Sequence, residues 1–310
     1  MLPSSGAMVT RMTIVAAVQG TPAFDRDSTI DRIARYTKEA AAHGAALVAF
    51  PEAFVPHYPD WGWRTNPWGE LDRAWYDRWS AQCVDVPSSA TASLGTIAAD
   101  NNVYLAAPVN ERDGGTIYNT ILYFSPEGAL LAKHRKLVAT GAERIMWGSG
   151  DGSTLATIDT PFGRVGGLIC WENYMPLARA AMYEAGVDIL LSPTWDNSSV
   201  WVPSMQHIAR EGRCYVVGVT ACIRGSDVPD DAPGRADIYG ADDDFLSRGN
   251  SVIVDPKGHI IAAPKPGEVT TLYADVDLDV VRNARREFDP VGHYARPDVF
   301  QLRVNRAPFA

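Results

Sequence analysis

Cys170 is the residue of this sequence whose position most directly suggests chemistry. It follows the apolar run VGGLI and stands directly before the tripeptide WEN. The strand expected over residues 165–169 ends there, and the next helix has Pro176 in its first turn, where the missing N–H costs nothing. A cysteine on such a turn is a candidate nucleophile, although a free cysteine can equally be a small buried apolar residue. The catalytic interpretation therefore requires partners elsewhere in the chain.

Two acids and a lysine could supply those partners. Glu52 comes just after the apolar run ALVAF. Burial there would raise its pKa toward that of a general base, although an isolated carboxylate at a strand end is more often part of a structural ion pair. Lys136 ends the basic run KHRK, which is usually typical of a solvated strand face. It also opens a glycine-rich polar stretch that contains Glu143, so the lysine could be held beside acids.

Together these residue types make a coherent set for covalent catalysis. A thiol must lose its proton to attack, and a nearby carboxylate can take that proton while a cation stabilises the anion. Attack on an electrophilic carbon then builds negative charge on a nitrogen or oxygen atom. Lys136 and the backbone N–H after Cys170 could donate to that charge.

The elements that must position these residues alternate between helices and nearly continuous apolar strands. Such apolar runs fit strands covered on both faces, and their alternation with helices is typical of an α/β protein. The predicted strands are MTIVAAVQ, ALVAF, VYLAAPV, VGGLIC, VDILLS and YVVGVTACI, and the predicted helices are Thr29–Ala42, Leu71–Gln82, Ser93–Asp100, Leu177–Ala185 and Pro203–Arg213.

Turn residues modify this α/β pattern. The segments FSPEGAL, DTPFGRV and VDPKGHI each place Pro or Gly between apolar stretches, which predicts hairpins and therefore mixed sheets. Residues 224–245 are rich in Asp, Pro and Gly, so we expect a long surface loop there.

Composition limits the class of protein. Of the 310 residues, 46% are apolar and no linker divides residues 13–310, so we expect one domain there after a disordered segment over residues 1–12. The net charge of −9 argues against a nucleic-acid partner. The four cysteines show neither zinc-ligand spacing nor a disulfide framework. Neither a secretory signal nor a membrane-spanning run is recognised, so we expect a reduced, cytoplasmic protein that does not bind membranes.

Three segments, in order, resemble the nitrilase superfamily of carbon–nitrogen hydrolases, and most closely its nitrilase branch. They are FPEAF around Glu52, HRKL…TGAERIMWGSGDGSTL around Lys136, and GGLICWENYMPLARAAMY around Cys170. The similarity extends from about Thr13 to Val304, and CWEN and TGAER…WG are specific to the branch. The resemblance implies an α/β fold, a four-layer α-β-β-α sandwich of two mixed sheets with helices outside.

The same resemblance implies a division of roles. Glu52 is the expected general base, Lys136 the electrostatic stabiliser and Cys170 the nucleophile, while Glu143 helps to position the substrate and the lysine. It also implies no metal, no organic cofactor, and a homodimer or larger homo-oligomer that pairs through helices near the site. The implied reaction converts an organic nitrile, through a covalent thioimidate, to a carboxylic acid and ammonia. Expulsion of the thiolate from the tetrahedral intermediate would release an amide instead.

The pocket and the substrate are less constrained. Tyr58, Trp171 and Trp195 lie near the three segments and are candidate substrate contacts, because pockets are lined mainly by apolar and aromatic side chains. His57 and Ala139 stand where the branch commonly has Gly and Pro, so the pocket shape and the preferred nitrile stay open. The alternative functions are a cyanide-degrading enzyme or an aliphatic amidase with the same residues, and a catalytically silent binding or assembly module on the same fold.

Overall fold

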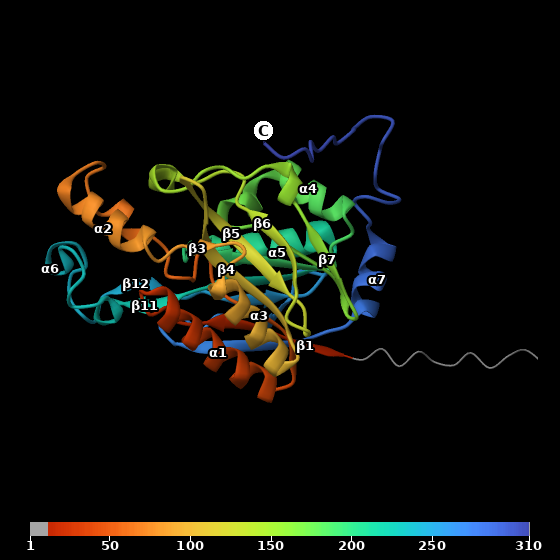
Figure 1. The fold of residues 1–310 in the computed structure, drawn as a ribbon. Helices are drawn as coiled ribbons and strands as arrows, with labels where there is room; N and C mark the ends of the chain where they lie inside the picture. The colour runs from red at the N-terminus through yellow and green to blue at the C-terminus, as the bar shows by residue number, and fades with distance from the viewer. Residues whose placement is uncertain (1–11, 310) are drawn as a thin grey trace, which may run out of the picture.

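The structure, a computed structural model that describes residues 12–309, is built around two mixed β-sheets (Figure 1). Apart from Met12, the segment expected to be disordered lies outside the described residues. The first sheet has the strand order β15-β1-β2-β4-β5-β6, with β3 beside β4. Its strands are β1 (Thr13–Gln19), β2 (Ala45–Ala49), β3 (Val84–Asp85), β4 (Tyr104–Asp113), β5 (Thr116–Phe124), β6 (Leu130–Arg135) and β15 (Thr270–Val276).

The second sheet has the order β14-β13-β10-β9-β8-β7. Its central strands β8, β9 and β10 are parallel, and its outer pairs are antiparallel hairpins. The three turns predicted from Pro and Gly are confirmed as the connections β5–β6, β7–β8 and β13–β14. The strands are β7 (Thr157–Thr160), β8 (Gly163–Gly167), β9 (Ile189–Thr194), β10 (Tyr215–Thr220), β13 (Val252–Val254) and β14 (Ile260–Ala262).

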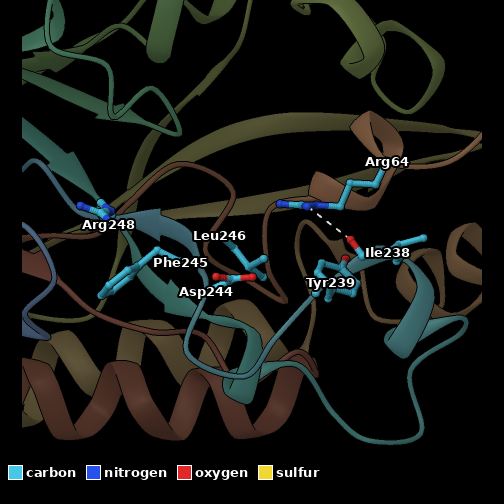
Figure 2. A pocket seen from close by; sticks show the side chains of 8 residues that line it. Arg64, Ile238, Tyr239, Asp244, Phe245, Leu246 and Arg248 are labelled. Atoms are coloured by element: carbon cyan, nitrogen blue, oxygen red, sulfur yellow. Dashed lines mark hydrogen bonds between the residues drawn. The ribbon is translucent and has the colours of Figure 1, made fainter.

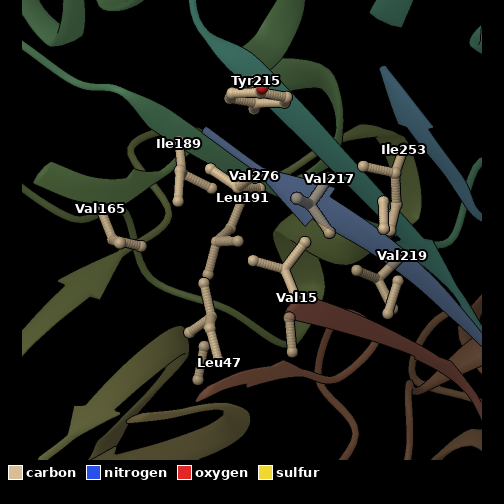
Figure 3. Packing of buried hydrophobic residues seen from close by; sticks show 14 of the residues in the cluster. Val15, Leu47, Val165, Ile189, Leu191, Tyr215, Val217, Val219, Ile253 and Val276 are labelled. Atoms are coloured by element: carbon tan, nitrogen blue, oxygen red, sulfur yellow. The ribbon is translucent and has the colours of Figure 1, made fainter. Parts of the chain in front are cut away.

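Apolar side chains from the inner faces of both sheets form the central core. Val15 and Leu47 of the first sheet lie in one cluster with Ile189, Leu191 and Val217 of the second (Figure 3). A second apolar cluster joins the first sheet to α1 (Arg26–Ala42) and α3 (Ser89–Asn101), and another joins the second sheet to α4 (Pro176–Glu184) and α5 (Trp201–Gly212). The four-layer α-β-β-α arrangement predicted from the sequence is therefore confirmed.

The helix boundaries follow from capping residues. Asp25 caps α1 by accepting from the Ser28 N–H, and Ser88 and Thr91 form a reciprocal capping box at the start of α3. Pro176 occupies the first turn of α4, as the sequence predicts. None of the helices described between residues 12 and 309 has the length and apolar character needed to cross a membrane.

Residues 224–245 differ from the expected surface loop. They connect β11 (Cys222–Arg224) to β12 (Phe245–Arg248), and they contain the short helices η5 (Gly225–Asp227) and α6 (Arg235–Ile238). Tyr239 is buried, and its hydroxyl donates to Asp60 at 3.1 Å. Its ring also packs edge-on against Trp75 of α2 (Glu70–Ser80). Aromatic burial therefore anchors a segment whose composition suggests only turns.

Two elements near the C-terminal end of the fold were not predicted from the sequence. The strand β15 pairs with β1 along its whole length, and α7 (Leu278–Glu287) follows it with Val281 and Ala284 buried. The inward residues of β15 alternate with exposed or half-buried ones, which is the ordinary signal of a strand with one covered face.

Candidate active site

Three of the predicted site residues form a buried cluster of charges, here called the acid–lysine cluster (Glu52, Lys136 and Glu143). The Lys136 ammonium donates to Glu52 Oε1 and to Glu143 Oε2, each at 2.7 Å. All three side chains are 2% exposed or less. Two carboxylates therefore share one ammonium ion in a site that is shielded from bulk solvent.

Glu52 follows β2 and is held by three donors. Besides Lys136, the Asn119 amide donates to its Oε1 at 2.8 Å, and the Trp195 backbone N–H donates to its Oε2 at 2.7 Å. The next residue, Ala53, has a φ of 48°, a conformation that costs a non-glycine residue energy and is common at functional sites. The turn after β2 is thus bent so that the carboxylate faces inward.

Lys136 is placed by the end of β6. Its backbone N–H donates to the Asn119 carbonyl at 2.8 Å, which continues the pairing between β5 and β6. Burial alone would lower the pKa of the ammonium, but the charges of Glu52, Cys170 and Glu143 outweigh burial and raise it. The ammonium has three N–H groups, and only two have acceptors among the described residues. The third can donate to a substrate.

Cys170 begins the short helix η4 (Cys170–Tyr174) and has a φ of 54°, in the left-handed region. Strand β8 ends at Gly167, so Leu168, Ile169, η4 and Met175 lie between the strand and α4, in place of the direct turn that the sequence predicts. The Thr194 hydroxyl donates to Cys170 Sγ at 3.1 Å, and the Asn173 amide donates to the carbonyls of Leu168 and Cys170. These bonds fix the bend that presents the thiol.

The electrostatics of the site favour a neutral thiol at rest. Burial and the nearby carboxylates, Glu52 first among them, raise the pKa of Cys170, and Lys136 only partly offsets this. Burial also raises the pKa of Glu52 despite the contact with Lys136. A carboxylate with a raised pKa is a better proton acceptor, so a proton can pass from the thiol to Glu52 while the sulfur attacks.

Glu143 connects the cluster to the aromatic residues. Its Oε1 accepts from the Tyr58 hydroxyl at 2.6 Å, and its Oε2 accepts from the Thr140 N–H at 2.7 Å. The Tyr58 ring lies parallel to the Trp195 ring, with centroids 4.3 Å apart. Tyr58 is thus fixed between the carboxylate and an aromatic partner, and Trp195 contacts both Tyr58 and, through its backbone, Glu52.

Trp171 lies differently from the other predicted substrate contacts. Its side chain is half exposed, and its Nε1–H donates to Asp196 at 2.9 Å. No described contact joins its ring to the acid–lysine cluster, so a role in substrate binding stays a prediction. His57 is buried against Phe24 and its Nδ1 faces the Tyr58 carbonyl. Burial lowers the pKa of His57 to about 4, so the ring is neutral at pH 7. Its contact with the Tyr58 carbonyl helps to hold the backbone of Tyr58. Ala139 is buried in the same apolar cluster as Tyr58.

Several residues that hold the site have little or no sequence signal. Three residues form hydrogen bonds with Glu52 or Cys170 but are not among the site residues predicted from the sequence. They are Asn119, Asn173 and Thr194. Asn173 stands inside the CWEN tetrapeptide and could have been found there. Asn119 is a buried polar residue in an apolar strand, which is a weak signal, because most such residues only satisfy hydrogen bonds.

A separate pocket of about 470 Å³ lies against the 235–248 segment (Figure 2). Arg64 reaches over it and donates to the Ile238 carbonyl at 3.3 Å, and Arg248 is on its wall. None of the predicted site residues lines this pocket. It therefore has no direct part in the chemistry of the acid–lysine cluster.

The two-sheet fold and the buried set of glutamate, lysine and cysteine define a class of enzymes that hydrolyse carbon–nitrogen bonds. Residues 14–286 match the carbon–nitrogen hydrolase family, and the chain belongs to this family. Several of its relatives are described as nitrilases. The chain is 46% identical over 301 residues to an aliphatic nitrilase of Sinorhizobium fredii (strain HH103), covering 94% of this chain and 96% of that protein.

Two further comparisons agree. The chain is 41% identical to a bifunctional nitrilase/nitrile hydratase of Nicotiana tabacum, covering 97% of this chain and 87% of that protein. The fold is similar to the crystal structure of Saccharomyces cerevisiae Nit3, a member of branch 10 of the nitrilase superfamily, with a TM-score of 0.69, 23% identity and coverage of 94% of this chain and 100% of that one. The family and fold predicted from the sequence are confirmed.

Proposed function

We propose that the protein is a nitrilase that converts an organic nitrile and two water molecules to a carboxylic acid and ammonia. The observation that carries this proposal is the Lys136 ammonium held between Glu52 and Glu143 in the buried site that also contains Cys170. This geometry supplies a nucleophile, a base and a fixed cation without any other group. The relatives named above support the choice of nitriles as substrates.

The first half of the reaction forms the covalent adduct. Cys170 Sγ adds to the nitrile carbon while Glu52 takes the thiol proton and passes it to the nitrile nitrogen, which gives a thioimidate. The free N–H of the Lys136 ammonium donates to the developing negative charge. A fixed donor in a dry site stabilises such charge far better than water does.

The second half releases the products. Glu52 takes a proton from a water molecule, which attacks the thioimidate carbon and gives a tetrahedral intermediate. Loss of ammonia leaves a thioester, and a second water molecule cleaves it to the acid and the free Cys170 thiol. If the intermediate expels the thiolate first, an amide is released. The relative described as both nitrilase and nitrile hydratase makes the proportion of amide worth measuring.

Tyr58 and Trp195 are the proposed walls of the substrate site, with Trp171 as a further candidate. The support for the first two is their stacking and their contacts with both glutamates. Flat aromatic walls favour an apolar group on the nitrile carbon. We therefore expect cyanide, which has no such group, to be a poor substrate.

The test is ammonia release across a panel of aliphatic, arylacetic and aromatic nitriles, cyanide, and the matching amides. Acid and ammonia from organic nitriles support the proposal. Formamide or formate from cyanide, or turnover of amides alone, would assign the protein to one of the two rival activities. A folded protein that turns over none of these compounds would indicate a silent binding or assembly module.

We also propose that the protein is a homodimer or a larger homo-oligomer. The support is a group of exposed apolar side chains on η4, α4 and near α5, and two-fold pairing is the common form of oligomer. Leu177 is 70% exposed and Val200 is 61% exposed, and the exposed Trp171 and Tyr174 lie on η4, just before α4. A monomeric mass in sedimentation at all concentrations would contradict this, and Leu177→Asp should weaken the dimer.

We also propose a cytoplasmic location, because all four cysteines are free thiols and disulfides are rare in reducing compartments. Fractionation of the source cells with an antibody to the protein tests it directly.

A further inference from the structure

A second buried pair of charged side chains lies beside the acid–lysine cluster. Glu172 is 1% exposed and lies two residues after Cys170. Its Oε2 accepts from the Ile169 N–H, and its Oε1 accepts from the Leu137 N–H, both at 2.6 Å. Ile169 directly precedes Cys170, and Leu137 directly follows Lys136. One carboxylate therefore binds the backbone next to both the nucleophile and the lysine.

His134 is the counter-ion of this carboxylate. Its Nε2 lies 3.0 Å from Glu172 Oε2, and its Nδ1 lies 3.1 Å from the Thr154 carbonyl oxygen. Both oxygens of Glu172 accept a backbone N–H, which fixes the orientation of the side chain. Each nitrogen of the His134 ring lies beside an oxygen atom, an arrangement that favours the imidazolium form, which donates from both nitrogens. Burial lowers the pKa of His134, but the charge and hydrogen bond of Glu172 outweigh burial and raise it.

The two segments joined by Glu172 belong to different sheets. Strand β6, which leads to Lys136, is in the first sheet, and β8, which leads to Cys170, is in the second. Apolar side chains hold the sheets together, and apolar contacts do not depend on direction. The hydrogen bonds of Glu172 are directional, so they can set how one sheet edge sits against the other at the site.

We propose that Glu172 is a positioning residue that fixes the Cys170 thiol relative to the Lys136 ammonium, with the contact to His134 holding the Glu172 side chain in place. Cys170 has a left-handed φ, and such a conformation persists only where its surroundings hold it. The inference rests on the proposed function for its kinetic part, because that part assumes nitrile turnover.

The decisive variant is Glu172→Gln. The amide has the same shape, but its NH₂ group must face either the Ile169 N–H or the Leu137 N–H, so one of the two backbone hydrogen bonds of this side chain is lost. We expect kcat for a good nitrile to fall about 100-fold, the loss typical of a misplacement near 1 Å. We expect KM to change less than about threefold, since no hydrogen bond joins Glu172 to Tyr58 or Trp195. The same misplacement of the thiol should slow the alkylation of Cys170 by iodoacetamide.

Glu111→Gln is the matched control. Glu111 is also 1% exposed and accepts from Lys133, Arg135 and Thr120, but it bonds to no backbone beside Lys136 or Cys170. This variant should lose thermal stability while kcat and the alkylation rate stay within about twofold of the wild type, as the absence of any contact with the reacting groups requires.

The outcomes separate the possibilities. A fall in kcat and in alkylation rate for Glu172→Gln alone supports the inference. Wild-type values in that variant, a change confined to KM, or equal losses in Glu111→Gln would overturn it. If Glu172→Gln does not fold, His134→Gln decides, because an unchanged alkylation rate in that folded variant also overturns the inference. If the wild type hydrolyses no nitrile, the proposed function fails, whereas the alkylation rates still test the role of Glu172.

Discussion

The basic run Lys133–Lys136 divides between two sides of one strand. Lys133 and Arg135 project to one side, where both bind the carboxylate of Glu111. His134 and Lys136 project to the other, toward Glu172 and the acid–lysine cluster. The alternation of side chains in a strand thus separates four adjacent basic residues into two environments.

The two sides differ in the number of cations that bind each of the compared carboxylates, Glu111 and Glu52. Glu111 is one carboxylate with two cations, and although burial raises its pKa, the bonds to Arg135 and Lys133 outweigh burial and lower it. On the other side one ammonium serves two carboxylates, and burial keeps the pKa of Glu52 raised. The same residue types therefore make a structural acid with a lowered pKa on one side and a proton acceptor with a raised pKa on the other.

Cys170→Ala should have the largest effect on activity, because it removes the thiol whose proton Glu52 accepts. We expect kcat to fall by about 10⁴-fold or more, as for the loss of other catalytic nucleophiles. The fold should remain, since Cys170 is small and buried. Circular dichroism and ammonia release measure the two effects, and a covalent adduct with a nitrile in this variant would show that another residue attacks.

Lys136→Ala tests the shared ammonium. It should show neither turnover nor adduct, because loss of one fixed donor typically costs about 10²–10³ in rate. Glu52→Gln should differ, forming some adduct that is cleared slowly, since Glu52 also activates water. Intact-mass spectrometry after addition of a nitrile distinguishes them, and rapid clearance of the adduct in Glu52→Gln would exclude Glu52 as the base.

Glu143→Gln tests the second carboxylate of the acid–lysine cluster, and its effect is compared with that of Glu111→Gln. We expect it to remain folded and to lose most turnover, about 10²-fold, because Lys136 and Tyr58 would no longer be held in one geometry. Glu111→Gln should cost stability instead. Near-normal rates in Glu143→Gln would make Glu143 a structural acid like Glu111.

The pH dependence of stability should be the smallest of these effects. His134 has a pKa raised above 6.5 by Glu172, the charged group that faces it, so its contribution is complete below pH 6.5 and is lost as the pH rises through the folded-state pKa. Glu111 has a pKa lowered below 4.5, so its contribution is present above pH 4.5 and is lost as the pH falls through the folded-state pKa.

Thermal unfolding over a pH range that extends well below 4.5 and well above 6.5 checks both transitions. The difference in Tm between wild type and His134→Gln should shrink toward alkaline pH, and the difference from Glu111→Gln should shrink toward acid pH. Differences that stay constant with pH would mean that neither group changes its charge state as described.

The sequence predicted the layers and the reacting residues because both depend on local patterns. Apolar strands, helix caps and Pro or Gly turns are local, and Glu52, Lys136 and Cys170 each stand beside such a pattern in a segment that resembles a known family. The roles of Asn119 and Glu172 arise from contacts between residues 67 and 35 positions apart, across strands and sheets. No spacing along the chain encodes those contacts.

The predicted loop at 224–245 illustrates the same limit. Its composition indicates turns, and turns are present, but the burial of Tyr239 against Trp75 depends on a helix more than 150 residues earlier. Only the three-dimensional arrangement shows that this stretch is anchored.

The neutral resting state of Cys170 has a consequence for the lifetime of the protein. Peroxides and electrophilic metabolites attack thiolates, and a protonated, buried sulfur is a poor target for them. Because the thiol loses its proton only as it attacks, the nucleophile is exposed to oxidative damage mainly during turnover. An idle preparation should therefore age slowly in air, and loss of activity should follow the number of catalytic cycles rather than the hours of storage.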